Sequence, residues 1–152
     1  MAARTHTVKC PFDPRKPATL AICCSDGRYI RAIEQFLFSQ GVDDHDLICL
    51  PGGPARICHE CASIFEVSVA MEGIDYLVES HATQSVLLLA HDDCGFYKKR
   101  FGECDSERQK TDLLRARERI LERHSKLKVA AYLARPASGK KQDGFILQEI
   151  CV

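Results

Sequence analysis

The sequence lacks long apolar runs and net charge. No stretch approaches the roughly 18–20 apolar residues that a membrane-spanning helix needs. The 21 Lys and Arg residues balance the 21 Asp and Glu residues. This balance argues against a nucleic acid or an anionic membrane as a partner held by charge alone. It also leaves little electrostatic repulsion between copies of the chain, so net charge does not oppose self-association.

Export signals, internal repeats and low-complexity tracts are also missing. Residues 1–17 lack the apolar core of a secretory signal, so we expect a cytoplasmic protein. Nine cysteines would suggest disulfides in a small secreted protein. In a cytosolic protein an odd number of cysteines instead favours metal ligation and ordinary buried thiols.

The chain has 152 residues, of which 45% are hydrophobic and 28% charged. These values suit one soluble, globular domain with a real core. Residues 1–17 carry Pro11, Pro14 and Pro17 and little apolar pattern, so they are predicted to form an extended N-terminal arm. Residues 18–152 are predicted to form the domain.

Short apolar runs alternate with stretches of helical periodicity. Strands are predicted over residues 18–24, 46–50, 85–90, 128–134 and 145–150, and helices over about 26–41, 60–80 and 106–123. The second helix is predicted to turn Ile64, Val67, Met71, Ile74 and Val78 toward the core, and the third to have a solvated charged face. The order predicts a three-layer α/β fold, with helices on both faces of a mainly parallel sheet and an antiparallel C-terminal edge hairpin.

Potential metal ligands follow two of the predicted strands. Cys24 ends the first strand, and His91 and Cys94 follow the third. Open α/β sheets place their ligand sites beyond the C-terminal ends of the strands, so the three side chains would converge if these strands are neighbours. Two thiolates and one imidazole are a ligand set that zinc prefers. Three protein ligands leave a fourth position open, as in catalytic zinc sites.

Polar residues beside these ligands have two interpretations. Asp26 could take the fourth zinc position or accept a hydrogen bond from a zinc-bound hydroxide, with Arg28 keeping it ionised and oriented. Alternatively, Asp26 is a helix cap and Arg28 a surface residue. The neighbouring cysteine and histidine set favours the first interpretation. Asp92 or Asp93 could also accept a hydrogen bond from the His91 ring.

The two ligand segments resemble a known family. Cys24-Ser25-Asp26-Gly27-Arg28 and His91-Asp92-Asp93-Cys94 are similar to the Cys-x-Asp-x-Arg and His-x-x-Cys motifs of the β-class carbonic anhydrases. The resemblance covers roughly residues 18–150 and identifies a short, divergent member.

This resemblance implies a zinc enzyme that reversibly hydrates carbon dioxide to bicarbonate. Cys24, His91 and Cys94 would bind Zn²⁺, and a zinc-bound hydroxide would attack the small-molecule substrate. Asp26 and Arg28 would gate the fourth position and orient the nucleophile. Family members are dimers or tetramers, which implies a homodimer or homotetramer here.

Two segments depart from the family pattern. Leu50-Pro51-Gly52-Gly53 stands where members carry an Arg-Asn-x-Gly type segment, although its glycines still let the backbone pass close to the site. Arg15-Lys16-Pro17 stands where many members place a substrate-contacting glutamine. The alternatives are therefore a related zinc hydrolase of carbonyl sulfide or carbon disulfide, and a non-catalytic zinc-binding homologue.

Cys58-His59-Glu60-Cys61 forms a second cluster. It could be a redox dithiol or an extra metal site at a helix N-terminus, where the helix dipole lowers the pKa of a thiol. A thioredoxin-like motif would follow the first strand of its fold, and this one does not. Two cysteines packed along the inner face of the helix are therefore the favoured interpretation.

Overall fold

A five-stranded sheet in the order β2-β1-β3-β4-β5 forms the middle of the protein. The computed structural model describes residues 8–10, 12–140 and 143–151. The strands are β1 (Thr19–Cys24), β2 (Asp46–Leu50), β3 (Ser85–His91), β4 (Lys128–Pro136) and β5 (Phe145–Glu149). The first four run parallel and β5 pairs antiparallel with β4. The predicted sheet and its C-terminal edge hairpin are confirmed.

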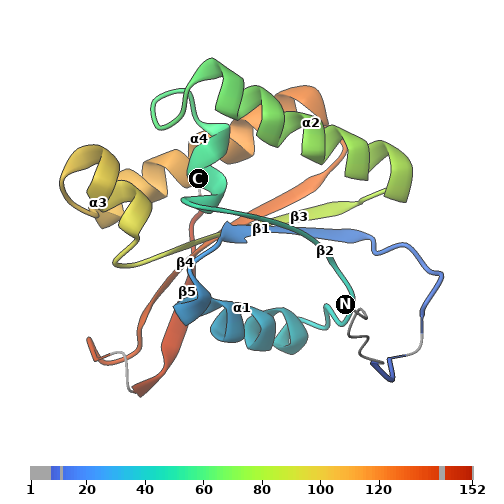
Figure 1. The fold of residues 1–152 in the computed structure, drawn as a ribbon, viewed down its shortest axis with the longest axis horizontal. Helices are drawn as coiled ribbons and strands as arrows, with labels where there is room; N and C mark the ends of the chain where they lie inside the picture. Colours follow the sequence, from blue (N-terminus) through green and yellow to red (C-terminus); the bar gives the residue numbers. More distant parts are fainter. Residues whose placement is uncertain (1–7, 11, 141–142, 152) are drawn as a thin grey trace, which may run out of the picture.

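Helices cover both faces of this sheet, as predicted (Figure 1). α1 (Gly27–Ser39) packs on one face, over a core that includes Ala21, Cys23 and Leu89. The opposite face carries η1 (Gly53–Ile57), α2 (Ile64–His81), α3 (Gly95–Phe101) and α4 (Ser106–Arg123). Because successive strand residues point to opposite faces, Cys24 belongs to this second core and Cys23 to the first.

Capping interactions set where two helices begin. The Asp26 carboxylate accepts the Arg28 amide at the start of α1, as predicted. In α2 the Ser63 hydroxyl accepts the Glu66 amide, and the Glu66 carboxylate accepts the Ser63 amide. This capping box starts α2 at Ile64, so the predicted start near Glu60 was wrong.

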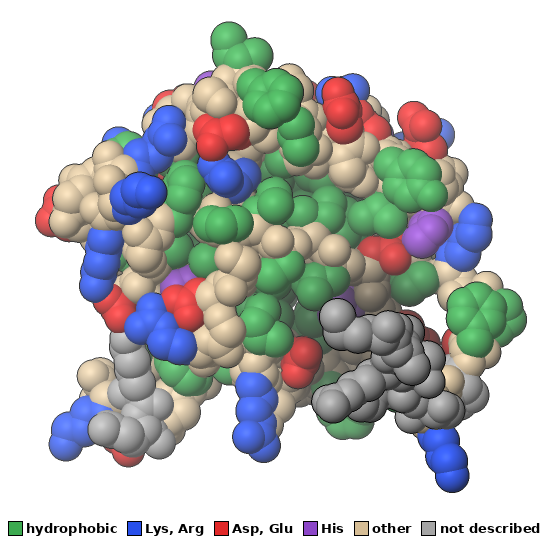
Figure 2. Space-filling model, in the orientation of Figure 1, with side chains coloured by type: hydrophobic (Ala, Val, Ile, Leu, Met, Phe, Trp, Pro, Cys, Tyr) green, Lys and Arg blue, Asp and Glu red, His purple; other side chains and the backbone are tan. Residues whose placement is uncertain are grey.

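The expected inner face of α2 needs one correction. Val67, Met71 and Ile74 are buried as predicted, but Ile64 is 77% exposed. Ile64 is the first helical residue and lies before the helix has turned its apolar stripe onto the sheet. Apolar side chains gather on the solvent side of α2, where Phe65 is also 77% exposed, and charges of both signs surround them (Figure 2).

Two short elements were not predicted: η1, which follows β2, and α3, which follows the segment that carries Cys94. The bounds of α4 match those predicted, but its polar side is not fully solvated. Gln109 and Asp112 are each only 1% exposed. Both therefore need hydrogen-bond partners inside the protein.

Only part of the segment predicted as an N-terminal arm lies within the described residues. Residues 1–7 and 11 lie outside the described residues. The described residues from 8 to 18 form neither helix nor strand, and Val8 and Phe12 are largely exposed. Within the described parts of the chain, no helix is both long and apolar enough to cross a bilayer.

Candidate metal centre

The order of the strands brings the predicted ligands together. β1 lies between β2 and β3, and it pairs with β3 in parallel, with Cys23 opposite Leu89. α1 follows β1 on one face of the sheet, and α3 and α4 follow β3 on the other, which makes the ends of β1 and β3 a topological switch point. Cys24 is the last residue of β1 and His91 is the last residue of β3. The two strands are therefore neighbours, which is the condition under which the three side chains were expected to converge.

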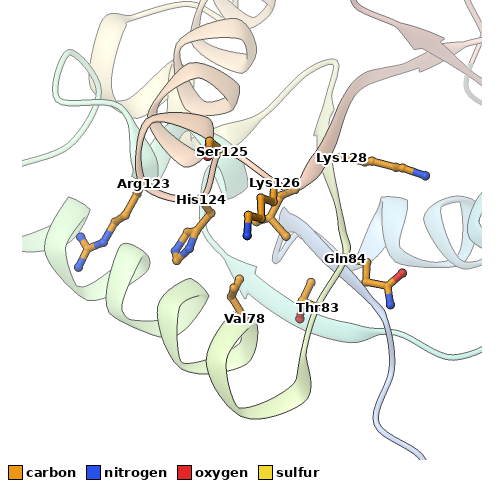
Figure 3. Close-up of a pocket in the computed structure, with 9 residues that line it drawn as sticks. Val78, Thr83, Gln84, Arg123, His124, Ser125, Lys126 and Lys128 are labelled. Carbon is orange, nitrogen blue, oxygen red and sulfur yellow. The ribbon is translucent and has the colours of Figure 1, made fainter.

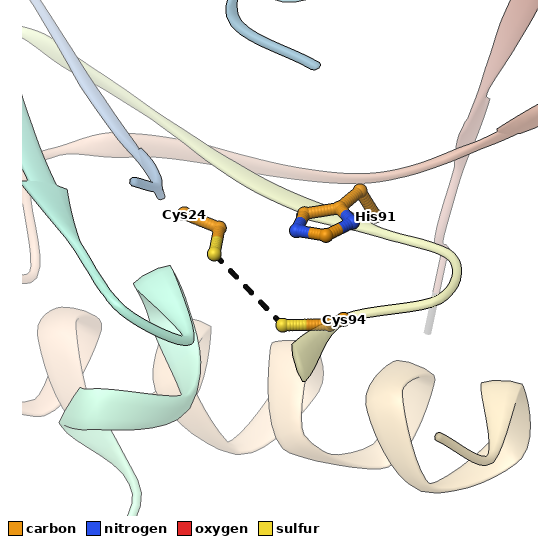
Figure 4. Close-up of side chains that lie close together, drawn as sticks. All are labelled: Cys24, His91 and Cys94. Carbon is orange, nitrogen blue, oxygen red and sulfur yellow. Dashed lines mark hydrogen bonds between the residues drawn. The ribbon is translucent and has the colours of Figure 1, made fainter. Parts of the chain in front are cut away.

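Cys24, His91 and Cys94 form a compact buried cluster (Figure 4). One donor atom from each lies within 4.8 Å of the other two. The sulfur atoms of Cys24 and Cys94 are 3.8 Å apart. Cys94 reaches this position because it caps α3, directly after the turn that follows β3. In this turn Asp93 has a φ of +60°.

The hydrogen bond at His91 Nδ1 determines which nitrogen faces the cluster. Nδ1 lies 2.7 Å from the backbone oxygen of Asp92, and a carbonyl can only accept, so Nδ1 carries the hydrogen. Nε2 then has a free lone pair; it is buried and has no hydrogen-bond partner among the described residues. The acceptor of this nitrogen is therefore the Asp92 backbone carbonyl, and not the Asp92 or Asp93 carboxylate considered as one possibility.

Hydrogen bonds also favour the ionised form of Cys24. Its pKa lies well below that of an ordinary thiol, chiefly because of the hydrogen bond with Cys94, with a further contribution from the Gly52 amide. The Gly52 amide nitrogen is 3.3 Å from Cys24 Sγ. Since the thiolate is the form that binds metals, the pair is suited to ligation.

The segment after β2 passes very close to β1. A Cβ atom at Gly53 would lie 2.7 Å from the carbonyl carbon of Cys23 and from the amide nitrogen of Cys24. Gly53 also has a φ of +51°, which favours glycine. These values confirm the expectation that the glycines let the backbone approach the site, and the approach brings the Gly52 amide to Cys24.

Asp26 and Arg28 lie at the edge of the cluster. Asp26 Oδ2 is 4.0 Å from His91 Nε2. Arg28 Nε donates to both carboxylate oxygens of Asp26, at 2.9 and 3.1 Å, and these hydrogen bonds are the main cause that lowers the pKa of Asp26 to about 2. Arg28 also contacts Asp93, with Nη1 3.3 Å from Oδ2. Asp26 caps α1 and faces the cluster, so its two interpretations are compatible.

The chemistry of these donors fits a zinc ion. The cluster offers two sulfur atoms and one buried imidazole nitrogen, a set that suits tetrahedral zinc. A buried nitrogen without a partner is costly, and a bound cation would satisfy it. The ionised Asp26 beside the cluster adds a negative charge.

The other cysteine cluster lies apart from this group. Cys58 and Cys61 are buried in the turn before α2, not in a helix. Their thiols donate to Asp112, Cys58 to the backbone oxygen and Cys61 to Oδ2, each at 3.0 Å. Burial raises the pKa of Cys58 to about 12. Buried thiols in such surroundings are inert. Both cysteines are buried as predicted, but they precede the helix instead of lying along its inner face.

Two cavities show where a ligand could enter. One, of about 580 Å³, lies at the opposite end of the sheet between α2 and the start of β4. Its basic side chains Arg123, Lys126 and Lys128 point in different directions, so they do not form one binding site (Figure 3). A second cavity, of about 520 Å³, is lined by Pro51, Arg56, Glu66, Gly95, Phe96, Lys99 and Arg100. Gly95 directly follows Cys94 in the chain, so this cavity is the nearer of the two to the metal cluster.

Three residues around the cluster were not predicted as site residues. Tyr29 stacks on the His91 ring, Gln109 donates to the His91 carbonyl, and Asp112 accepts from the Tyr97 hydroxyl. Tyr29 follows the Cys24–Arg28 motif directly, but its periodicity indicated only a core position. Gln109 and Asp112 lie among charged residues, and no sequence signal separated them from the solvated side of α4.

Comparison with known sequences gives one family and uncharacterised relatives. A family model described as "Putative carbonic anhydrase" matches residues 15–138. An uncharacterised protein of Rickettsia bellii is 29% identical over 124 residues, which cover 76% of this chain and 75% of that protein.

Solved structures share the fold at low sequence identity. A carbonic anhydrase from Streptococcus mutans has a TM-score of 0.59 at 14% identity, over 96% of this chain and 88% of that chain. The apo form of a carbon disulfide hydrolase has a TM-score of 0.55 at 13% identity, over 90% and 80%. Tetrameric β-carbonic anhydrases from Sordaria macrospora have a TM-score of 0.50 at 16% identity, over 91% and 82%.

Proposed function

The chain belongs to this carbonic anhydrase family as a divergent β-class member, and from this membership we propose that it reversibly hydrates carbon dioxide to bicarbonate. The observation that carries the proposal is the buried Cys24, His91 and Cys94 cluster with an ionised aspartate at its edge. Cys24, His91 and Cys94 would hold zinc, and Asp26 and Arg28 would be the catalytic pair.

The bound metal would supply Lewis acidity that brings the pKa of a water molecule close to neutrality. The protein's part is to arrange donors around that water. Cys24 is favoured as a thiolate, and Cys94 lies within 3.8 Å of its sulfur. His91 presents Nε2, because Nδ1 is occupied by the Asp92 carbonyl. The Gly52 amide limits the negative charge on the Cys24 sulfur.

Asp26 would orient the nucleophile. Its hydrogen bonds with Arg28 keep the carboxylate ionised, so it only accepts hydrogen bonds at neutral pH. An attacking water that donates to Asp26 Oδ2 would have its remaining lone pair directed at the carbon of carbon dioxide. Arg28 fixes the carboxylate from the outer side and is itself 56% exposed. The proton of the reaction then leaves to solvent rather than remaining on Asp26.

Hydrolysis of carbonyl sulfide or carbon disulfide is the second candidate. The carbon disulfide hydrolase neighbour shows that this fold accommodates such chemistry in another protein. In this chain the departure at Leu50-Pro51-Gly52 favours it, because these residues bring no polar side chain to the segment beside the cluster. Phe96 further makes that side apolar, since its ring lies against Gly52. Apolar surroundings suit a substrate without hydrogen-bonding groups.

Stopped-flow measurement of carbon dioxide hydration tests the first candidate. We expect zinc-loaded protein to accelerate proton release, and Cys24→Ala to lose zinc and activity together. Cys151→Ala is the matched control, because Cys151 is exposed and lies outside the cluster. Sulfide release from carbonyl sulfide or carbon disulfide without carbon dioxide hydration would favour the second candidate. A zinc-loaded protein inactive on all three substrates would be a non-catalytic homologue.

We further propose that the protein forms a homodimer or homotetramer and is cytoplasmic. The tetrameric β-carbonic anhydrases of the same fold, the zero net charge and the exposed apolar side chains of α2 support an oligomer. Cys23, Cys24, Cys58, Cys61 and Cys94 are buried and form no disulfide, and free thiols suit a reducing compartment. Light scattering coupled to gel filtration measures the oligomer, and cell fractionation tests the compartment.

A further inference from the structure

His91 is held on three sides by groups from different parts of the chain. Its ring nitrogen Nδ1 donates to the Asp92 carbonyl at 2.7 Å, within its own turn. Its ring face contacts Tyr29 from α1, and its backbone carbonyl accepts from Gln109 in α4. Only Nε2 remains, and it faces the Cys24 and Cys94 sulfurs. We propose that Tyr29 and Gln109 are positioning residues that fix the direction of this nitrogen.

The contact with Tyr29 controls the plane of the imidazole. The two ring centroids are 4.0 Å apart with an interplanar angle of 26°, which is a stacked arrangement. Tyr29 is itself 1% exposed and is backed by Phe145 of β5, with ring centroids 4.8 Å apart. An imidazole can rotate about two side-chain torsions, and the stack blocks rotation on one face. Tyr29 therefore acts through the orientation of the ring rather than by ligation.

The hydroxyl of Tyr29 adds nothing that the structure uses. It is buried and has no hydrogen-bond partner among the described residues. A phenylalanine would keep the stacked ring and remove this unsatisfied group. The positioning role therefore belongs to the aromatic face, and a phenylalanine at this position should preserve it.

Gln109 fixes the backbone from the other face of the sheet. Its side-chain nitrogen donates to the His91 carbonyl at 2.8 Å, and the residue is 1% exposed. Its side-chain oxygen is buried without a hydrogen-bond partner among the described residues. Burying an amide with one end unsatisfied is costly, so a simple packing role would be better served by an apolar residue. We therefore assign Gln109 the role of holding His91, the last residue of β3, in place through its backbone carbonyl.

The proposal rests on the proposed zinc site, and a measurement of zinc affinity tests it directly. Affinity is measured by competition with a chromogenic chelator, and the cobalt-substituted protein reports ligand geometry through its ligand-field absorption. We expect Tyr29→Leu and Gln109→Met to bind zinc about 10- to 100-fold more weakly, as on loss of other groups that orient a metal ligand. We also expect both to alter the cobalt spectrum. Tyr29→Phe should match the wild type in both measurements.

Two variants control for the substitutions themselves. Tyr76→Leu and Gln35→Met make the same changes at exposed helical positions away from the cluster, and neither should change zinc affinity. Folding is checked by circular dichroism, and Gln109→Met alone decides the matter if Tyr29→Leu does not fold. Folded Tyr29→Leu and Gln109→Met proteins with wild-type affinity and spectrum would overturn the proposal. A wild-type protein that binds no zinc would instead refute the proposed function, and this inference with it.

Discussion

Replacing Gly53 by alanine should damage the site through backbone contact alone. A Cβ atom there would lie 2.7 Å from two backbone atoms at the end of β1, which cannot move aside as a flexible side chain could. The left-handed backbone of Gly53 adds about 1–2 kcal/mol for any other residue. Overpacking of a tightly packed region typically adds about 1–3 kcal/mol. We therefore expect Gly53→Ala to lower the free energy of unfolding by about 2–5 kcal/mol.

Gly41→Ala provides the matched control. Gly41 has a φ of +72°, but a Cβ atom there would meet nothing within 4 Å. It should therefore show only the left-handed cost of about 1–2 kcal/mol. The difference between the two variants isolates the close approach of the Gly53 segment to β1. Urea denaturation followed by circular dichroism measures both free energies.

The same variant should also weaken metal binding. To relieve the contact, the segment must move away from β1, and the Gly52 amide then moves away from Cys24 Sγ. We expect Gly53→Ala to lose zinc affinity, while Gly41→Ala keeps it. Equal stability losses in the two variants, with zinc affinity unchanged in both, would refute this reasoning.

Three further predictions concern other contacts. Cys61→Ala should lower the free energy of unfolding, measured by urea titration, by about 1–3 kcal/mol, because it removes a donor to the buried Asp112 carboxylate. Cys61→Ser keeps a donor and should lose less stability in the same titration. Capping hydrogen bonds lower the pKa of Glu66 from 4.5 to about 2. The contribution of Glu66 to stability is therefore present above pH 4.5 and is lost as the pH falls toward 2. In thermal melts, the melting temperature of Glu66→Gln should differ from that of the wild type at pH 7 and converge with it in that acidic range. Arg28→Lys keeps the charge but loses the hydrogen bonds of Arg28 Nε to both Asp26 oxygens. We therefore expect kcat/KM for hydration to fall about 10- to 100-fold at unchanged zinc content. An unaltered rate would argue against Asp26 as the orienting group.

The sequence predicted that Cys24, His91 and Cys94 come together because these residues lie at or just beyond the ends of two strands. Cys24 and His91 are terminal strand residues, so the parallel pairing of β1 with β3 alone brings them together. The capping role of Asp26 is equally local. For these positions the chain needs no information beyond strand order and the geometry of strand ends.

What could not be predicted depends on contacts between distant segments. The charged sequence of α4 resembles a solvated face, and only the packed structure shows that Gln109 and Asp112 point inward. The stack of Tyr29 on His91 joins residues 62 positions apart, and periodicity cannot indicate which core neighbours touch. α3 is seven residues long, too short for a clear apolar period.

X-ray absorption at the zinc edge tests the central claim most directly. On zinc-loaded protein we expect two sulfur ligands at about 2.3 Å and one imidazole nitrogen at about 2.0–2.1 Å. Cys24→Ala should bind too little zinc to give this signal, while Cys151→Ala should leave the spectrum unchanged. Zinc bound without sulfur ligands, or a spectrum unaffected by Cys24→Ala, would contradict the assignment of Cys24, His91 and Cys94 as the metal centre.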